Sequence, residues 1–334
     1  MEQDNRTIGE TNLGEIIDIP MGGKKNIIMD SQILTAVMSC PRLTDFRFNH
    51  NFSAIAGKSN SLECGSITHK FMEVYYGSMI KGLDKEKAFG FGITAAQLYI
   101  QGCKDCTNFE STPAQKKPIC GHKPGDYPGV TNTPKDSVAY QTGWQFVLDT
   151  CDEYHRYYRN DHWVPLEVET VKGEVLYEDD DIRILWKAKL DLTADTNQGI
   201  FPIDHKTMKQ RRETVSLNNQ FIGQCILMKT RNVFINKIGF QKSLKPEEKF
   251  VRAPISYSAA RLLEWQGETL PFYAKQLLMY AEIGHYPPNY NHCEGKYGNC
   301  NFINVCQSDP GMREEELKLH FTVGPQWNPV NEDD

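Results

Sequence analysis

In the first half of the chain, apolar residues recur at the spacing of helices. Asp30 or Ser31 is a candidate N-cap, because it directly precedes a helical apolar pattern. The apolar face of this first helix consists of Ile33, Leu34, Val37 and Met38. We predict further helices over 62–80 and 138–158, and an extended, glycine-rich lead-in over 1–29.

From residue 164 to 207 the pattern changes to an alternation of period two, which indicates strands. Leu166 and Val168 alternate with Glu167 and Glu169. Turns are predicted at the acidic run 178–181 and near Asn197–Gly199. Helices are predicted over 214–230 and 255–284, with the short strand NVFINKIGF between them. These elements predict an α/β fold with a mixed central sheet flanked by helices.

Composition narrows the class of protein. A hydrophobic content of 40% and a formal charge of −6 are ordinary for a globular chain. No apolar run approaches the roughly 18 residues of a membrane span, and the polar start MEQDNRTIGE lacks the pattern of a secretory signal. We therefore expect a soluble, cytoplasmic protein without a membrane partner.

Basic residues cluster locally despite the negative total charge. Such clusters can contact the phosphates of nucleic acids, but they are also compatible with ordinary solvated faces. They are Lys206, Lys209, Arg211 and Arg212, then Lys229 and Arg231, then Lys242 and Lys245.

Two carboxylates and a lysine stand at comparable points of neighbouring predicted strands. Asp191 lies late in one strand, and Asp204 and Lys206 share one face of the next. A hairpin that brings Asp191 beside Asp204 would offer the oxygen ligands that Mg²⁺ or Mn²⁺ prefers, with an ammonium close by. Such a site suits phosphodiester chemistry. Taken alone, the Asp-x-Lys pair is equally compatible with a surface ion pair.

Ten cysteines in a chain without an export signal favour metal binding over disulfides. The insertion 102–137 contains Cys103, Cys106, Cys120 and His122 at zinc-site spacing. We expect structural zinc there, and unliganded thiols are the alternative. Three isolated cysteines are expected to act as small buried hydrophobic residues, namely Cys64, Cys151 and Cys225.

The stretch KAKLDLTADTNQGIFPIDHKT resembles the RecB-like branch of the PD-(D/E)XK nucleases, and so does GSITHKF upstream. The resemblance implies that Asp191, Asp204 and Lys206 are catalytic, with His69 as a further metal ligand. Gly65, one turn before His69, would clear space for metal and DNA.

Two more positions follow from the same resemblance. Glu73, one turn after His69, would orient its imidazole from behind. Gln220 matches the helical glutamine that contacts the catalytic strand or the substrate in this branch. The tyrosine usual four residues later is replaced by Gln224, a departure that bears on the substrate contact rather than on the metal site.

The remaining cysteines form a one-plus-three arrangement. It consists of Cys40, Cys293, Cys300 and Cys306. This resembles the iron–sulfur subgroup of these nucleases, the CRISPR-adaptation exonucleases and the AddB subunit, which implies a 4Fe–4S cluster that ties the chain ends together. The six residues between Cys293 and Cys300 exceed the usual spacing. Zinc bound by four thiolates is the alternative.

The resemblance implies a restriction-endonuclease-like domain over 30–310, closed by the four-cysteine site, with a peripheral acidic tail over 311–334. It implies a Mg²⁺- or Mn²⁺-dependent DNA nuclease, an exonuclease acting on single strands or free ends in repair, recombination or replication. The alternative is a DNA-binding or assembly module with a vestigial site. The cysteines disfavour a restriction-type endonuclease, and no P-loop motif is present. No protein partner is indicated.

Overall fold

The fold is that of a computed structural model, which describes residues 17–18, 24–55, 60–100, 138–208, 217–241, 243–295 and 298–324. In this part of the chain, seven strands form one mixed sheet in the order β1-β2-β5-β6-β7-β8, with β4 on the other side of β5. Its strands are β1 (Ile17–Asp18), β2 (Lys25–Met29), β4 (Val164–Glu178), β5 (Ile182–Thr196), β6 (Gly199–Met208), β7 (Asn232–Gly239) and β8 (Phe250–Ser256). The predicted α/β class with a mixed, helix-flanked sheet is confirmed.

Strand β5 organises the sheet because it has different partners along its length. β4 pairs with it antiparallel throughout, through the turn at 178–181 that the acidic run predicted. On the opposite edge, β2 pairs parallel with residues 182–186, whereas β6 pairs antiparallel with residues 192–196. Between these two paired segments, the middle of β5 is not paired with either strand. Asp191 lies in this part of β5.

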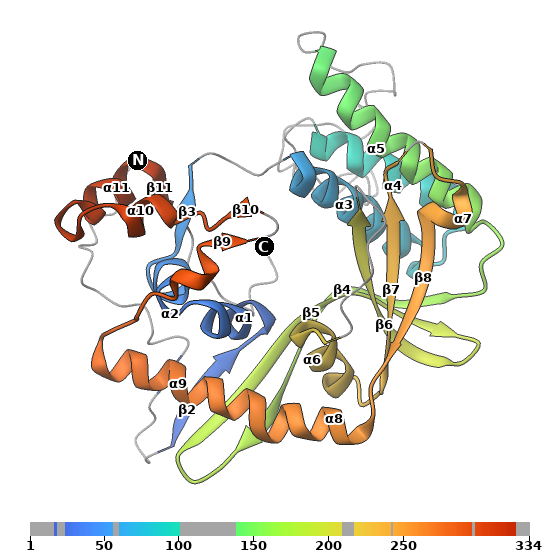
Figure 1. Ribbon diagram of the computed structural model, residues 1–334. Coiled ribbons are helices and arrows are strands. Elements are labelled where there is room, and N and C mark those ends of the chain that lie inside the picture. Colours follow the sequence, from blue (N-terminus) through green and yellow to red (C-terminus); the bar gives the residue numbers. More distant parts are fainter. Residues whose placement is uncertain are drawn as a thin grey trace, which may run out of the picture.

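Helices cover the sheet in two groups, each with its own core (Figure 1). The helices α3 (Asn60–Ile80), α4 (Lys85–Ile100) and α5 (Val138–Tyr157) pack around Phe71, Tyr75 and Leu192. The helices α1 (Ser31–Ser39), α6 (Asn219–Leu227) and α9 (Leu270–Ile283) pack around Trp186. Asp30 caps α1 as predicted, since its carboxylate accepts from the backbone N–H groups of Gln32 and Ile33.

Gly223 explains how closely α6 approaches the sheet. A Cβ atom at this position would lie 2.4 Å from the indole nitrogen of Trp186, a distance that no side chain could accept. A glycine is therefore required where α6 crosses β5.

Both ends of the described chain meet in a separate aromatic cluster. Strand β3 (Phe52–Ala54) pairs antiparallel with β11 (Phe321–Val323), and Phe302 stacks on Phe321 with ring centroids 4.4 Å apart. Leu317 of α11 (Arg313–His320) is buried in the same cluster. Residues 313–323 therefore belong to the fold, whereas the sequence analysis placed them in a peripheral tail. Sparse apolar residues in an acidic segment gave no periodicity from which their burial could be read.

Other differences concern elements that the sequence pattern did not reveal. β2 is an interior strand of the sheet although it falls in the predicted lead-in, so the boundary at residue 30 cuts through the core. α4 and β8 were not predicted. The helix expected over 255–284 begins later, as α8 (Ala259–Glu264), and continues through a π-helical turn (Trp265–Thr269) into α9.

The remaining elements are short. They are α2 (Pro41–Thr44), the π-helical turn Asp45–Asn49, α7 (Pro246–Lys249), the 3-10 turns Tyr290–His292 and Pro310–Met312, β9 (Glu294–Gly295), β10 (Gly298–Asn299) and α10 (Ile303–Gln307). Among the helices described, none combines the length and the apolar character needed to cross a membrane.

Candidate metal site and four-cysteine site

The register of the β5–β6 hairpin brings the two predicted aspartates together. The pair farthest from the turn is Leu192 with Ile203. The next residue on each strand is an aspartate, so Asp191 and Asp204 lie opposite each other. At this point the strands part, and Asp191 Oδ2 accepts the backbone N–H of His205 at 2.8 Å. The carboxylates therefore lie just beyond the end of the β5–β6 ladder.

Asp204 and Lys206 share one face of β6, as the sequence predicted. Lys206 Nζ lies 2.8 Å from Asp204 Oδ2, and the Asp204 side chain is completely buried. Gln220 of α6 bridges the pair: its Nε2 donates to Asp204 Oδ1 at 2.8 Å, and its Oε1 accepts from Lys206 Nζ at 3.3 Å. Gln220 thus contacts β6, and Gln224 lies buried one turn further along α6.

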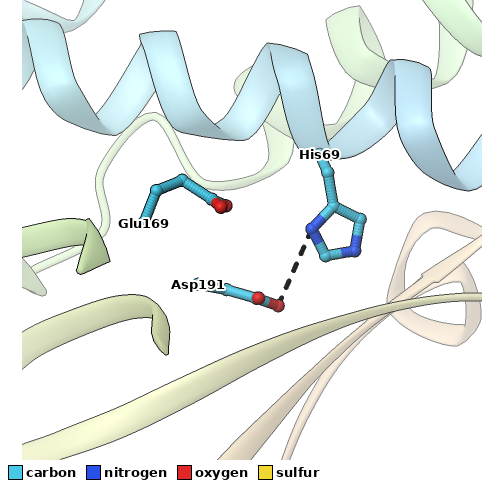
Figure 2. Close-up of side chains that lie close together, drawn as sticks. All are labelled: His69, Glu169 and Asp191. Carbon is cyan, nitrogen blue, oxygen red and sulfur yellow. Dashed lines mark ion pairs between the residues drawn. The ribbon is translucent and has the colours of Figure 1, made fainter. Parts of the chain in front are cut away.

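His69 reaches the same place from α3. Its Nδ1 lies 3.7 Å from Asp191 Oδ2, and Figure 2 shows its ring pointing down from the helix toward that carboxylate. Glu169 of β4 completes the group, because one ligand atom from each of His69, Glu169 and Asp191 lies within 4.8 Å of the others. This is the spacing of ligands around a single small cation.

Sequence reasoning missed Glu169. In the β4–β5 register, Val168 faces Leu192 and Thr170 faces Leu190, which puts Glu169 opposite Asp191. Counting back from the predicted turn would not have revealed this neighbour, because the register shifts by one residue between Val175 and Tyr177. Glu169 also has a φ of 51°, in the left-handed region that a non-glycine residue rarely adopts. Such backbone strain concentrates at functional sites.

Negative charge is crowded at this site. Burial raises the pKa of Asp191 to about 7, and the neighbouring charge of Asp204 adds to the effect. Burial also raises the pKa of Glu169, with Asp191 as the second cause. Burial opposes the charge of Lys206, but the nearby Asp204 carboxylate outweighs it and raises the pKa of this lysine. One further cation between the carboxylates would relieve their repulsion.

Burial lowers the pKa of His69 and so favours its neutral form, the form of imidazole that binds metal ions. Glu169 is also paired with Lys189, whose Nζ lies 3.1 Å from its carboxylate. Lys189 is two residues from Asp191 on the same strand, and its side chain is partly exposed. The positive charge of Lys189 therefore partly balances the negative charge of the Glu169 carboxylate.

Strand β6 is also tied to α3, the helix that carries His69. His205, between Asp204 and Lys206, is buried and stacks on Tyr76 of α3, with ring centroids 5.8 Å apart and planes at 6°. Asn236 Nδ2 of β7 lies 2.8 Å from His205 Nδ1. These contacts fix the position of α3 relative to β6 and so set the distance between the metal-binding side chains.

Two residues predicted from the His69 motif have clear positions. A Cβ atom on Gly65 would lie 3.3 Å from Thr207 Oγ1, so the glycine lets the start of α3 approach the end of β6. Glu73 is bonded to Lys70, at 3.1 Å, on the same helix. The predicted contact of Glu73 with the imidazole of His69 is not among the hydrogen bonds or ion pairs of the described residues.

The four predicted cluster cysteines are also brought together. Cys40, Cys293, Cys300 and Cys306 all line one cavity of about 750 Å³. Asn289 fastens the two ends of the chain there: its backbone N–H donates to Cys40 Sγ at 3.3 Å, and its Nδ2 donates to the carbonyl of Ser39 at 2.9 Å. Burial raises the pKa of Cys300, and the thiols of the other three cysteines raise it further.

The long spacing between Cys293 and Cys300 has a structural explanation. The residues between them form the β9–β10 hairpin, in which Glu294 pairs with Asn299. At its base the backbone N–H of Cys300 donates to the carbonyl of Cys293 at 2.8 Å. This backbone hydrogen bond holds the two cysteines side by side in the chain despite the longer spacing.

Several predicted residues lie outside the part of the chain that the structure describes. They are Cys103, Cys106, Cys120 and His122 of the expected zinc site, and Lys209, Arg211, Arg212 and Lys242 of the basic runs. Of the three isolated cysteines, Cys151 and Cys225 are buried as predicted, and Cys64 is partly buried. In the second basic run, Lys229 lies 3.5 Å from Glu174.

No protein-family model and no curated protein matches the chain. Among solved structures, one titled "Crystal structure of SSO0001" is similar over 41% of this chain and 66% of that one. The sequence identity is 11% and the TM-score is 0.25, values too low to support an argument about fold or function. The chain spans just under two thirds of the length of that structure.

Proposed function

We propose that the protein is a Mg²⁺- or Mn²⁺-dependent deoxyribonuclease that hydrolyses phosphodiester bonds in single-stranded DNA or at DNA ends. One observation carries the proposal: His69, Glu169 and Asp191 hold ligand atoms within 4.8 Å of one another beside the Asp204–Lys206 pair. The type of DNA substrate rests on the resemblance to RecB-like nucleases alone.

The donor set suits a hard divalent cation. Carboxylate oxygens and one imidazole nitrogen favour Mg²⁺ or Mn²⁺ over the soft ions that thiolates select. His69, Glu169 and Asp191 would hold the ion, and Asp204 of the neighbouring strand β6 lies opposite Asp191. When bound, the ion would polarise the phosphate and lower the pKa of a water molecule.

The protein groups have separate tasks in this proposal. Lys206 Nζ is partly exposed and fixed by Asp204 and Gln220, so it can place a positive charge where the phosphate gains negative charge. Gln220 keeps the lysine and the aspartate in fixed orientation through one amide. The backbone N–H of His205 donates to Asp191 Oδ2 and so holds the orientation of this carboxylate. His69 Nδ1 lies near the same oxygen.

We further propose that the four cysteines hold a 4Fe–4S cluster with a structural role. A tetrahedral zinc ion with bonds of about 2.3 Å would draw its sulfur ligands to within about 3.8 Å of one another. Among the described residues, the four cysteine sulfurs do not form a group with mutual distances within 4.8 Å. The choice of a polynuclear cluster over a single zinc ion rests on the resemblance to the iron–sulfur nucleases.

The second candidate function is a DNA-binding or assembly module whose nuclease site is vestigial. Its distinguishing feature would be DNA binding without cleavage. The complete set of ligands, together with an oriented lysine, favours the enzyme.

A cleavage assay separates the two functions. Linear and circular single-stranded DNA, and end-labelled duplex DNA, are incubated with Mg²⁺, Mn²⁺ or EDTA and compared with the Lys206→Ala variant. We expect cleavage of linear single strands that requires the metal and Lys206. DNA binding without cleavage under every metal condition, by folded protein, would support the second function instead. The ratio of linear to circular cleavage distinguishes exonuclease from endonuclease action.

A further inference from the structure

The cavity at the four cysteines has an unusual balance of charges. Its ionisable lining consists of the four thiols with Arg42, Arg47 and His292. Among the residues described, no aspartate or glutamate lines it. The rest of the wall is apolar or uncharged, with Phe46, Phe52 and other members of the aromatic cluster on one side. Such a wall favours an anionic occupant over a free cation.

The two arginines differ in their surroundings. Arg47 is exposed, and its Nη2 donates to Gln32 Oε1 at 2.7 Å. Arg42 follows Cys40 by two residues, and its Nη1 is buried without a hydrogen-bond partner among the described residues. A guanidinium nitrogen without an acceptor is costly, and Arg42 also lines the cavity, so a negative charge held there would offset this cost.

We infer that Arg42, a half-buried residue of the cavity wall, is the counter-charge of an anionic centre held by Cys40, Cys293, Cys300 and Cys306. Four thiolates around a core of charge about +2 carry a net charge of about −2, whether the core is an iron–sulfur cluster or a zinc ion. Arg42 supplies a positive charge at the wall of that centre. The inference rests on the proposed four-thiolate centre and is independent of the nuclease activity.

A nearby positive charge has a measurable effect on a redox centre. Reduction adds negative charge, so a buried cation stabilises the reduced form and raises the reduction potential. It also stabilises the thiolates against protonation and loss of the metal. Removing Arg42 should therefore lower the potential and speed metal loss. Removing Arg47 should do less, because its guanidinium is already bonded to Gln32 and lies near the Asp30 carboxylate.

The test compares the full-length wild type with Arg42→Gln, Arg42→Lys and the matched control Arg47→Gln, all purified without oxygen. Iron and zinc are counted, the rate of metal loss to a chelator is followed, and the midpoint potential is measured by a redox titration. We expect Arg42→Gln to shift the reduction equilibrium about tenfold toward the oxidised form, which is about 59 mV for one electron. Metal loss should be about tenfold faster.

The other two variants sharpen the result. Arg42→Lys keeps the charge without the guanidinium fork, so we expect a potential near that of wild type but faster metal loss. Because it is the milder change, it also tests the inference if Arg42→Gln does not fold. Arg47→Gln should change each quantity less than twofold. If the centre holds zinc, metal loss is the deciding measurement.

Three outcomes would overturn the inference. The first is an Arg42→Gln protein, or failing that an Arg42→Lys protein, that loses metal at the rate of wild type. The second is an Arg47→Gln protein with the same change as Arg42→Gln. The third is wild-type protein with neither iron nor zinc on the four thiols. None of these outcomes bears on DNA cleavage, so the inference and the proposed nuclease activity can fail separately.

Discussion

The metal site and the four-cysteine site are built in opposite ways. Asp191, Asp204 and Lys206 come from one hairpin, and their distances follow from its register. Cys40 and Cys306 lie at opposite ends of the sequence and meet only because β3 pairs with β11 and Asn289 bonds Cys40. A hairpin places its side chains by local geometry, whereas the cysteine cavity depends on closure of the whole chain. Changes in the first should affect chemistry, and changes in the second should affect stability.

The largest expected effect is on cleavage. Asp204→Ala or Asp191→Ala should reduce the rate by more than about 10²-fold, because loss of a residue behind a ligand already costs 10–100-fold. The colour and iron content of the protein should stay unchanged, since the cysteine site does not depend on these residues. Cleavage of an end-labelled strand and absorption spectra test both statements. Full activity in folded Asp204→Ala protein would reject the proposed site.

Cys40→Ser should produce the reverse pattern. Loss of a structural metal is among the changes that destabilise by more than about 4 kcal/mol. We expect loss of colour, a lower free energy of unfolding, and faster proteolysis near residues 40–55 and 285–324, the two segments that the site ties together. Cys64→Ala serves as the control and should retain its colour. A stable, fully coloured Cys40→Ser protein would show that this cysteine is no ligand.

Glu169→Gln tests the ligand that the sequence did not reveal. The amide keeps the size of the side chain but removes its charge, so Mn²⁺ affinity should fall by about 10–100-fold, the range for lost metal-site partners. Titration with Mn²⁺ followed by electron paramagnetic resonance measures this directly. Glu167→Gln is the matched control, because Glu167 pairs with Lys172, 2.8 Å away. Equal losses in both variants would argue against a specific role for Glu169.

The raised pKa of Asp191 predicts the effect of pH on the metal site. Metal binding requires the carboxylate, and protons compete for it below the pKa of about 7. Mn²⁺ affinity should therefore fall on acidification, approaching about tenfold per pH unit below pH 7. An affinity that is constant between pH 5.5 and 7 would contradict the raised pKa.

The same group affects the stability of the metal-free protein with a defined sign. The pKa of Asp191 is about 7 in the folded chain against an ordinary value of 3.8, so the folded state binds more protons between these values. The contribution of this group to the free energy of unfolding therefore decreases as pH rises from about 4 to 7. Comparison of wild type with Asp191→Asn by denaturant unfolding isolates this contribution.

The smallest expected effect is that of Gly65→Ala. Alanine favours the helix by up to about 1 kcal/mol, but its Cβ would lie 3.3 Å from Thr207 Oγ1. The two effects oppose each other, so stability should change by less than about 1 kcal/mol. Cleavage should fall severalfold, because α3 must shift and it carries His69. Combining the change with Thr207→Ala should restore activity if the contact is the cause.

Local pattern was enough to predict much of this protein. Alternation over 164–207 predicted β4, β5 and β6, and the shared face of Asp204 and Lys206 follows from the two-residue repeat of a strand. Capping chemistry predicted the start of α1 at Asp30. In each case the residues that decide the structure are close together in sequence.

Other features required the tertiary structure. Glu169 joins the site through the β4–β5 register and its left-handed backbone conformation. Neither the amino-acid composition nor the hydrophobic periodicity of the segment predicts these two features. The burial of Phe321 and the role of β2 come from pairing with distant strands.

The four-cysteine site shows both contributions in one place. The sequence determined which residue types are available, and the one-plus-three pattern indicated that they act together. Only the folded chain decided that Arg42 Nη1 would have no hydrogen-bond partner among the described residues, while Arg47, five residues later, would bond Gln32. Residue chemistry is fixed by sequence, but burial and the identity of neighbours depend on contacts between segments that the chain order keeps far apart.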